Sequence, residues 1–258
     1  MSACAMAALP ALAAKPSSAK KGFGIALKAN PDWRTKLEML RANWFYTWGS
    51  KMPEGIPPGV EYVPMVWGRW SCNDQTMRRL AAEKHKTLLG FNEPDQKDQA
   101  NVTVEQALEI WPKLMESGMR LGSPAGVHPD GEWMEAFMEQ VKRRGYRVDF
   151  IAVHSYYGKV PKHFLKRLEK LHKLYKRPLW ITEFAVADWA ARADNPNQYS
   201  PDDVCRFMEA VLPALEKSDY VERYAWFSAP KPTPVLAPSA LFDQNGALTK
   251  LGRLYSAI

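Results

Sequence analysis

The sequence has few cysteines and no long hydrophobic run. Its three cysteines, Cys4, Cys72 and Cys205, lack the spacing of a metal site, and an odd number cannot all pair within one chain. We therefore expect neither a structural metal nor an essential disulfide. No uninterrupted apolar segment approaches the roughly 20 residues that a membrane-spanning helix needs, so we expect no membrane span.

A glycine-rich phosphate-binding loop is also missing. The first predicted strand, 23–27, leads directly into Lys28 instead of the Gly-x-Gly-x-x-Gly pattern of a dinucleotide-binding fold. No recognition motif for DNA or RNA is present, although the formal net charge is +7. The basic residues cluster at 142–147 and 159–177, in stretches typical of a solvated helix face. We therefore expect no nucleotide cofactor and no nucleic-acid partner.

Aromatic residues, in contrast, are plentiful. The 258 residues include ten Trp, ten Tyr and ten Phe, and several of them come where predicted strands end. This is more than a core of this size requires, so the excess indicates a surface on which a ligand stacks.

The first 20 residues differ from the rest of the chain. Residues 4–14 are small and apolar and end in an alanine-rich stretch, which is followed by Lys15 and Pro16. This segment resembles the end of an export signal, but the basic start of such a signal is absent, which leaves a misplaced start or a disordered arm as alternatives. We assign residues 1–20 to a residual signal peptide or disordered arm and residues 21–258 to one folded domain, and we expect a secreted or cell-envelope protein.

From Gly22 onward, short β-rich runs alternate with longer amphipathic ones, as in βα units around a parallel sheet. The expected strands are 23–27, 44–48, 62–67, 87–91, 120–124, 150–156, 179–184 and 223–228. The expected helices are 31–41, 73–84, 103–117, 132–143, 161–175, 201–217 and 249–257. Residues 49–59 are turn formers, so this crossover is expected to be a bare loop. The predicted fold is α/β, a single compact (β/α)8 TIM-type barrel without a helix between strands two and three.

Polar residues follow three of the expected strands. Asn92 and Glu93 end the fourth strand, His154 and Tyr156 the sixth, and Glu183 the seventh. In a (β/α)8 barrel the reactive groups lie at the carboxyl ends of the strands. Strands four and seven face one another across an eight-stranded ring, so the two glutamates can approach closely.

Two close carboxyl groups suit the cleavage of a glycosidic bond with retention of configuration. That reaction needs them about 5 to 5.5 Å apart, one protonated to serve the leaving oxygen and one ionised to attack the anomeric carbon. Two carboxylates this close repel one another, which favours different protonation states. Taken singly, Glu93 could be a helix-entry residue and Glu183 half of an ion pair; their pairing favours a retaining hydrolase. This chemistry needs no cofactor.

The residues around both glutamates resemble glycoside hydrolase family 128, endo-β-1,3-glucanases in the clan of retaining (β/α)8-barrel β-glycosidases. The likeness is carried by segments 89–95 (LGFNEPD), 153–156 (VHSY) and 180–184 (WITEF), and it extends over residues 22–254. It implies that Glu93 is the general acid/base, that Glu183 is the nucleophile, and that the substrate is a β-1,3-glucan.

The resemblance also implies roles for the polar neighbours of the two glutamates. Asn92 is expected to hydrogen-bond the sugar 2-hydroxyl next to the scissile bond, an interaction that strengthens in the transition state. Tyr156 is expected to hold the carboxylate of the nucleophile, and His154 to line the subsite or orient a carboxylate. The alternatives are an Asx turn for Asn92 and ordinary core positions for the other two.

Three tryptophans are candidates for stacking on glucose rings. Trp226, in the last strand, resembles the aromatic floor beneath the bound sugar in this clan, because a pyranose face packs well on an indole. Trp48 and Trp67 end strands two and three and are the next candidates, with core or loop packing as the alternative.

The sequence leaves the substrate open, because this pair of glutamates serves glucanases, mannanases and xylanases alike. A retaining hydrolase of mixed-linkage glucan, mannan or xylan is therefore an alternative. A non-catalytic glycan-binding barrel, or a cell-wall protein that adheres through its basic surface, belongs to a different class. Both glutamates are present, which favours an enzyme. We expect a monomer.

Overall fold

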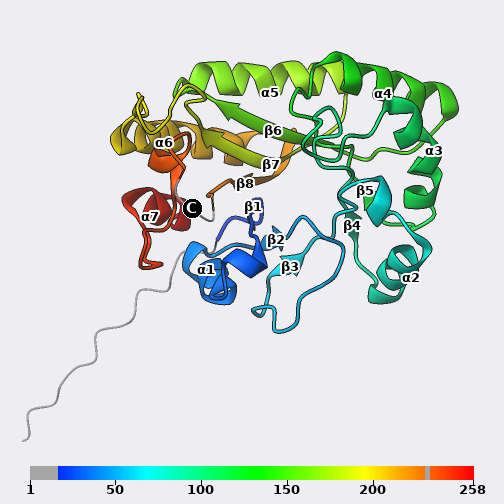
Figure 1. Ribbon diagram of the computed structural model, residues 1–258, viewed down its shortest axis with the longest axis horizontal. Coiled ribbons are helices and arrows are strands. Elements are labelled where there is room, and N and C mark those ends of the chain that lie inside the picture. Colours follow the sequence, from blue (N-terminus) through cyan, green and yellow to red (C-terminus); the bar gives the residue numbers. More distant parts are fainter. Residues whose placement is uncertain (1–16, 230–232) are drawn as a thin grey trace, which may run out of the picture.

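Strands and α-helices alternate along residues 17–229 and 233–258, which the computed structural model describes (Figure 1). The strands are β1 Lys21–Gly24, β2 Trp44–Tyr46, β3 Glu61–Tyr62, β4 Thr87–Leu88, β5 Arg120–Leu121, β6 Ile151–Tyr157, β7 Leu179–Val186 and β8 Val221–Trp226. The helices are α1 Trp33–Leu40, α2 Asp74–Glu83, α3 Val104–Met115, α4 Glu132–Arg144, α5 Pro161–Tyr175, α6 Pro201–Lys217 and α7 Lys250–Ser256. The eight strands and seven helices expected from the sequence are therefore confirmed.

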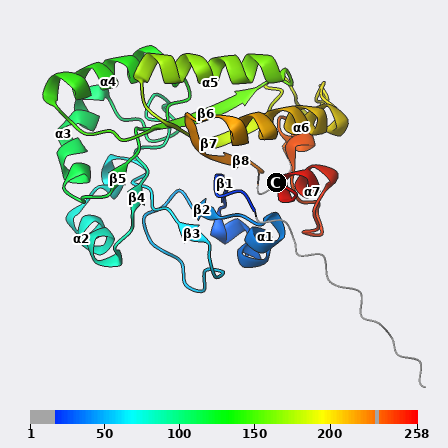
Figure 2. The ribbon, with the colours of Figure 1, turned by 180° about the vertical axis from the view of Figure 1, so that it is seen from behind.

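The strands are parallel and are paired in chain order. Six of them form one sheet in the order β3-β2-β1-β8-β7-β6, and β4 pairs with β5. Single parallel bridges, Met65 with Leu89 and Gly122 with Phe150, join these two sheets. The pairings thus run around all eight strands, as in a (β/α)8 barrel, and the helices lie outside them in both views (Figures 1 and 2).

The crossover from β2 to β3 contains no α-helix, as the sequence predicts. Three prolines interrupt this segment, and Gly55 and Gly59 adopt φ values of +68° and +80°. Backbone in this left-handed region suits glycine and ends any helical run.

Five strands are shorter than the sequence predicts: β1 and β2 keep four and three residues, and β3, β4 and β5 keep only two each. Close contact between backbone segments accompanies the early end of β4. A Cβ at Gly90 would lie 2.9 Å from the carbonyl oxygen of Ser123. Beyond this point strand pairing continues as isolated bridges, such as that of Asn92 with Ala125. The segments of β3, β4 and β5 nevertheless reach the carboxyl end of the barrel.

Two hydrophobic clusters position the site. The smaller one fills the barrel and consists of Trp44, Tyr46, Val63, Met65, Leu89, Phe150, Trp180 and Ala225. The larger one lies between the strands and the helices and includes residues of all seven helices. Because side chains alternate along a strand, neighbours on β8 belong to different clusters: Ala225 to the first, Tyr224 and Trp226 to the second.

Charged groups close the amino end of the barrel. Lys21 is fully buried, and its Nζ donates to the carbonyl oxygens of Tyr255, Ser256 and Ile258 at 2.8–3.2 Å, around the end of α7. The preceding Lys20 bonds carbonyl groups at the end of α6 in the same way. Lysine side chains at these positions satisfy carbonyls that the helix leaves without partners.

Two ion pairs lie at the same end. Arg120 pairs with Glu222 at 2.6 Å and Arg223 pairs with Glu61 at 2.5 Å. The indole of Trp180 donates at 2.8 Å to Oε2 of Glu222, the same oxygen that Arg120 approaches at 2.6 Å.

The proposed boundary at residue 20 stays a prediction, since residues 1–16 lie outside the described residues. Within the described ranges, no helix combines the length and apolar character needed to cross a bilayer.

Candidate active site

The two glutamates reach the mouth of the barrel through irregular backbone. Glu93 has φ +44°, a left-handed conformation that is uncommon for a residue with a side chain, and its N–H bonds the carbonyl of Ala125 at 2.8 Å. Glu183 lies where the register of β7 shifts against both neighbouring strands. Such irregularities re-aim side chains and cluster at functional sites.

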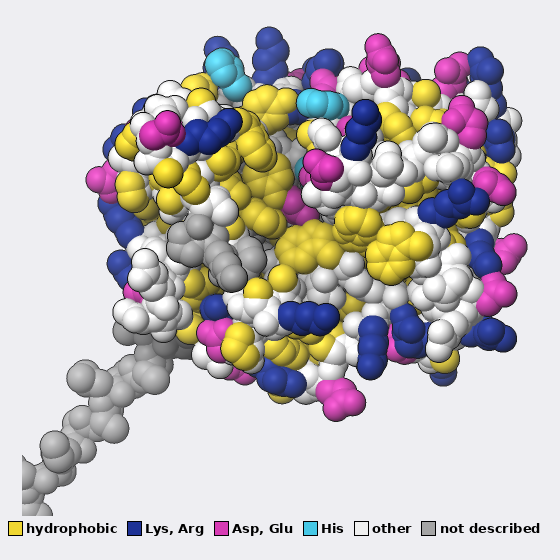
Figure 3. Space-filling model, viewed as in Figure 1, with side chains coloured by type: hydrophobic (Ala, Val, Ile, Leu, Met, Phe, Trp, Pro, Cys, Tyr) yellow, Lys and Arg dark blue, Asp and Glu magenta, His cyan; other side chains and the backbone are white. Residues whose placement is uncertain are grey.

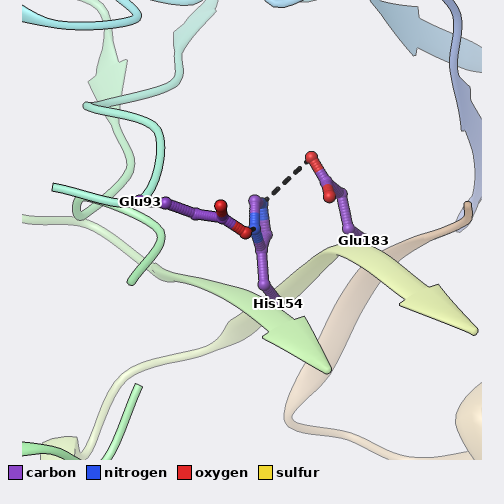
Figure 4. Close-up of side chains that lie close together, drawn as sticks. All are labelled: Glu93, His154 and Glu183. Atoms are coloured by element: carbon purple, nitrogen blue, oxygen red, sulfur yellow. Dashed lines mark hydrogen bonds and ion pairs between the residues drawn. The ribbon is translucent and has the colours of Figure 1, made fainter. Parts of the chain in front are cut away.

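His154 lies between the two glutamates (Figure 4). Its Nδ1 is 2.9 Å from Oε1 of Glu93, and its Nε2 is 3.3 Å from Oε1 of Glu183. The ligand atoms of all three side chains lie within 4.8 Å of one another. This separation is near that of retaining glycosidases and well short of the roughly 6.5–9.5 Å of inverting ones.

Neutral donors hold the carboxylate of Glu183. The indole N–H of Trp48 donates to Oε1 at 2.7 Å, and the hydroxyl of Tyr46 is 3.0 Å from the same oxygen. The hydroxyl of Tyr156 donates to Oε2. The predicted contact of Tyr156 with Glu183 is thus present, whereas the contact of Tyr46 was not predicted from the sequence.

The negative charge of the two glutamates shifts the pKa values of the side chains that contact them. Burial, reinforced by the charge of Glu183, raises the pKa of Tyr46 and Tyr156 well above 10, so both remain protonated donors. For His154, burial lowers the pKa, but the charge of Glu183 and the hydrogen bond with Glu93 outweigh it. The net result is a pKa of His154 above its ordinary 6.5, which favours an imidazolium between two carboxylates.

A cleft of about 1110 Å³ opens above these side chains. Figure 3 shows it as a hollow in which acidic atoms lie beside hydrophobic side chains. Its lining at the carboxyl ends of the strands comprises Trp48, Trp67, Asn92, Glu93, Gln99, Tyr156, Glu183, Trp189 and Phe227, and it continues past β1 to residues 242–246. Aromatic faces beside a few polar groups suit a sugar ligand.

Asn92 lines the cleft with an unused acceptor. Its Nδ2 donates to Gln99 at 3.2 Å, while its buried Oδ1 has no hydrogen-bond partner among the described residues. A buried acceptor without a partner is costly unless a ligand or water supplies a donor. This arrangement agrees with the expected bond to a sugar hydroxyl.

The two tryptophans after β2 and β3 both line the cleft. The ring of Trp67 lies 6.0 Å from that of Trp70, a side chain that is 73% exposed, and the role of Trp67 as a platform stays a prediction. Trp48 is different, because its N–H is committed to Glu183.

The prediction for Trp226 is wrong. This side chain has no exposed surface, packs against Phe184 and Phe207, and donates its N–H to Ser239. Strand alternation places it on the outer face of β8, where it cannot contact a sugar. The next residue, Phe227, lines the cleft instead.

Three aromatic residues of the site were not predicted from the sequence: Tyr46, a buried neighbour of Glu183, and Phe227 and Trp189, which line the cleft. Tyr46 precedes Trp48 by two residues, so the two-residue period of a strand predicts that both share a face. The same rule places Phe227 opposite to Trp226. Trp189, which is 62% exposed, lies in the loop after β7, and no sequence signal marks it as a cleft residue.

Glu93, His154 and Glu183 are also a possible ligand set for a metal ion, since each offers one atom. The oxygens of Glu183, however, already face N–H and O–H hydrogens, and both ring nitrogens of His154 face a carboxylate. The arrangement better suits proton transfer and nucleophilic attack than cation binding.

Comparison with known proteins places the chain in a family. The sequence pattern of the family described as glycosyl hydrolase catalytic core matches residues 22–255. Alkali-sensitive linkage protein 1 of Schizosaccharomyces pombe is 31% identical over 225 residues, which is 83% of this chain. The chain spans only 40% of the length of that relative.

Solved structures agree with this assignment. A family 128 (subgroup I) endo-β-1,3-glucanase from Amycolatopsis mediterranei, in complex with laminaritriose, is 35% identical, with a TM-score of 0.81 over 93% of this chain and 99% of that one. A family 128 (subgroup V) exo-β-1,3-glucanase from Cryptococcus neoformans is 25% identical, with a TM-score of 0.76 over 92% of this chain and 98% of that one. The chain belongs to the glycosyl hydrolase catalytic core family and is a member of glycoside hydrolase family 128.

Proposed function

We propose that the protein is a retaining endo-β-1,3-glucanase in which Glu183 is the nucleophile and Glu93 the general acid/base. The observation that carries this proposal is the close approach of the two glutamates, whose oxygens lie within 4.8 Å of one another at the mouth of the barrel. The cleft above them is large enough for several sugar rings.

The reaction runs in two displacements. Glu183 attacks the anomeric carbon while Glu93 gives its proton to the departing glycosidic oxygen, and water then hydrolyses the glycosyl ester with Glu93 as base. His154 engages Oε1 of Glu93, so Oε2 of that carboxyl is the oxygen available for proton transfer. The free Oδ1 of Asn92 accepts a hydrogen bond from the sugar 2-hydroxyl.

The substrate class rests on the relatives. The A. mediterranei enzyme was crystallised with laminarihexaose, laminaripentaose and laminaritriose, and its fold covers 93% of this chain. Cleavage within chains is favoured by the length of the cleft, because its lining includes residues beyond the two glutamates, from Gln99 after β4 to Asp243 after β8. A cleft with lining on both sides of the scissile bond accepts an internal linkage.

Product analysis tests the proposal. The pure protein is incubated with linear β-1,3-glucan, mixed-linkage glucan, cellulose oligomers, mannan and xylan, with Glu183→Gln as the control. We expect mutant-sensitive release of β-1,3-linked oligosaccharides of several lengths. A single short product from chain ends would replace endo with exo action, and cleavage of another polymer alone would overturn the linkage. Silence on the whole panel would favour a glycan-binding protein.

The roles of the two glutamates are separable by leaving group. Glu93→Gln removes the proton donor, so it should impair unactivated glucans most and substrates with an acidic phenol leaving group least. Glu183→Gln should impair both classes equally, because every substrate needs the nucleophile. Equal turnover by both variants and the wild type would refute the assignment.

The same proposal includes a monomer that acts outside the cell or in its envelope. The apolar segment at residues 4–14 supports export. Sedimentation of the purified protein and immunodetection of the full chain in cell fractions test these two points.

A further inference from the structure

The nucleophile is held unequally at its two oxygens. Oε1 of Glu183 receives the indole N–H of Trp48 at 2.7 Å, lies 3.0 Å from the hydroxyl of Tyr46 and is 3.3 Å from Nε2 of His154. Oε2 receives a hydrogen bond from Tyr156. Three of these four contacts therefore converge on one oxygen.

We propose that Oε2 of Glu183 is the attacking oxygen, and that Trp48 and Tyr46 are positioning residues that speed breakdown of the glycosyl-enzyme through Oε1. The inference rests on the proposed retaining mechanism and deepens it. Trp48 thereby has a role beyond stacking on sugar.

Both donors are fixed before substrate arrives. Tyr46 has no exposed surface, and its ring centroid lies 4.9 Å from that of Trp48. Its hydroxyl lies between two acceptors, 3.0 Å from Oε1 and 3.1 Å from the carbonyl oxygen of Thr182. Trp48 lies two residues beyond β2 and adopts φ +56°, and its ring is edge-on to that of Phe227, with the centroids 6.0 Å apart. Backbone strain of this kind persists where the surroundings over-determine the conformation. Oε1 is consequently the anchored oxygen.

The bond changes follow from this anchoring. In the first step, Oε2 forms a bond to the anomeric carbon, the bond to the leaving oxygen breaks, and Glu93 supplies the proton. In the second step, water attacks the anomeric carbon, gives a proton to Glu93, and the electron pair of the ester bond returns to the carboxylate of Glu183. Oε1 stays a hydrogen-bond acceptor throughout, as carboxylate oxygen and then as ester carbonyl.

The two steps respond oppositely to donors at Oε1. A hydrogen bond to a carboxylate is stronger than one to a neutral ester carbonyl. The donors therefore stabilise the free nucleophile more than the ester, which slightly slows attack. They stabilise the departing carboxylate in the second transition state, which makes Glu183 a better leaving group. Loss of one donor should slow the second step and spare the first.

A dinitrophenyl β-glycoside of laminaribiose makes the second step rate-limiting, since its leaving group departs without help. With this substrate, Tyr46→Phe should lower kcat about tenfold, lower KM in parallel, and leave kcat/KM within about threefold of wild type. Trp48→Phe should behave alike. Intact-mass spectrometry during turnover should show more glycosyl-enzyme in both variants than in wild type.

Matched controls separate this effect from general damage. Tyr175→Phe and Trp133→Phe remove a hydroxyl and an indole N–H that donate to backbone carbonyls away from the cleft, so they should keep wild-type kcat and KM. Tyr46→Phe is the deciding variant, because a fully buried ring cannot contact sugar. Thermal unfolding of each variant shows whether it folds.

The outcomes are distinguishable. A fall of kcat/KM with unchanged KM in Tyr46→Phe, or no accumulation of glycosyl-enzyme in either variant, would overturn the inference while leaving the proposed function intact. Failure of the wild type to release dinitrophenol and form a glycosyl-enzyme would instead remove the proposed function.

Discussion

The two ends of the barrel bury charge in different ways. At the amino end, each charge described above meets an opposite one or several carbonyl groups: Arg120 with Glu222, Arg223 with Glu61, and Lys21 with three carbonyls. At the carboxyl end, two glutamates share one histidine, and Glu183 is otherwise contacted by neutral donors.

Each end of the barrel has a tryptophan whose N–H donates to a glutamate, so the two glutamates can be compared directly. Trp180 bonds Glu222 at 2.8 Å, and Trp48 bonds Glu183 at 2.7 Å. Glu222 also has Arg120, which holds its pKa low against the opposing effect of burial. Glu183 instead shares its histidine with a second carboxylate. The amino end is therefore arranged for stability, while the carboxyl end keeps a reactive carboxylate at the expense of stability.

The largest expected effect comes from neutralising one glutamate at each end. Glu183→Gln should reduce turnover of β-1,3-glucan by about 10⁴-fold or more, because no other group takes over the nucleophile's role. It should leave the unfolding temperature unchanged or raise it, since a like-charge repulsion is removed. Glu222→Gln should keep kcat and lose about 1 kcal/mol of unfolding free energy, a modest value because the pair is partly exposed.

Reducing-sugar assays and chemical denaturation of both variants measure these changes. Loss of stability in Glu183→Gln together with unchanged stability in Glu222→Gln would break the comparison between the two ends.

Much of the fold could be predicted from the sequence because repeated patterns determine it. α5 and α6 have the bounds that the apolar period and the prolines at their first positions indicate. The lengths of β3, β4 and β5 could not be predicted, because a contact such as that of Gly90 with Ser123 joins segments distant in sequence. A hydrophobic run indicates which residues are buried. The length of a strand depends instead on hydrogen bonds to the partner strand, which the run does not specify.

The candidate site, like the fold, could be predicted only in part from the sequence. Glu93 and Glu183 could be predicted because both come at the ends of predicted strands that face one another across the ring. Trp226 was misplaced because the resemblance suggested an aromatic residue near the end of β8, and only the alternation along that strand decides between it and Phe227. The hydrogen bond from Trp48 to Glu183 could not be predicted, because it depends on the φ of +56° at Trp48.

A smaller effect is expected at the amino end, from Lys21→Met. The change leaves three carbonyl groups without their donor and should lower the unfolding free energy by about 1–3 kcal/mol while kcat stays unchanged. Denaturant titration and glucan hydrolysis measure the two quantities. A variant with lower kcat at full folding would show that the two ends are coupled.

The pH dependence of this effect has a definite sign. Burial, with Arg41 nearby, lowers the pKa of Lys21 to about 8 from 10.5. Between these values the unfolded chain binds more protons than the folded one, so stability from Lys21 rises with pH. The difference in unfolding free energy between wild type and Lys21→Met should grow from pH 8 to pH 10, by at most about 1.4 kcal/mol per pH unit. A constant difference would mean that Lys21 keeps its ordinary pKa.

The smallest effect is expected from removing metal ions. The carboxyl end holds more negative than positive charge, and Glu93, His154 and Glu183 present ligand atoms within 4.8 Å of one another, so a bound cation is the obvious way to balance it. Trp48, however, directs its N–H at Oε1 of Glu183 and Tyr156 its O–H at Oε2, so a cation at either oxygen would face the positive end of that group. We therefore expect glucan hydrolysis after dialysis against a chelator to equal that of untreated enzyme, with no gain from added calcium, magnesium, manganese or zinc. Activity that falls in chelator and returns with one of these ions would assign the balancing charge to a metal and make the carboxyl end resemble the amino end, with each carboxylate matched by a cation.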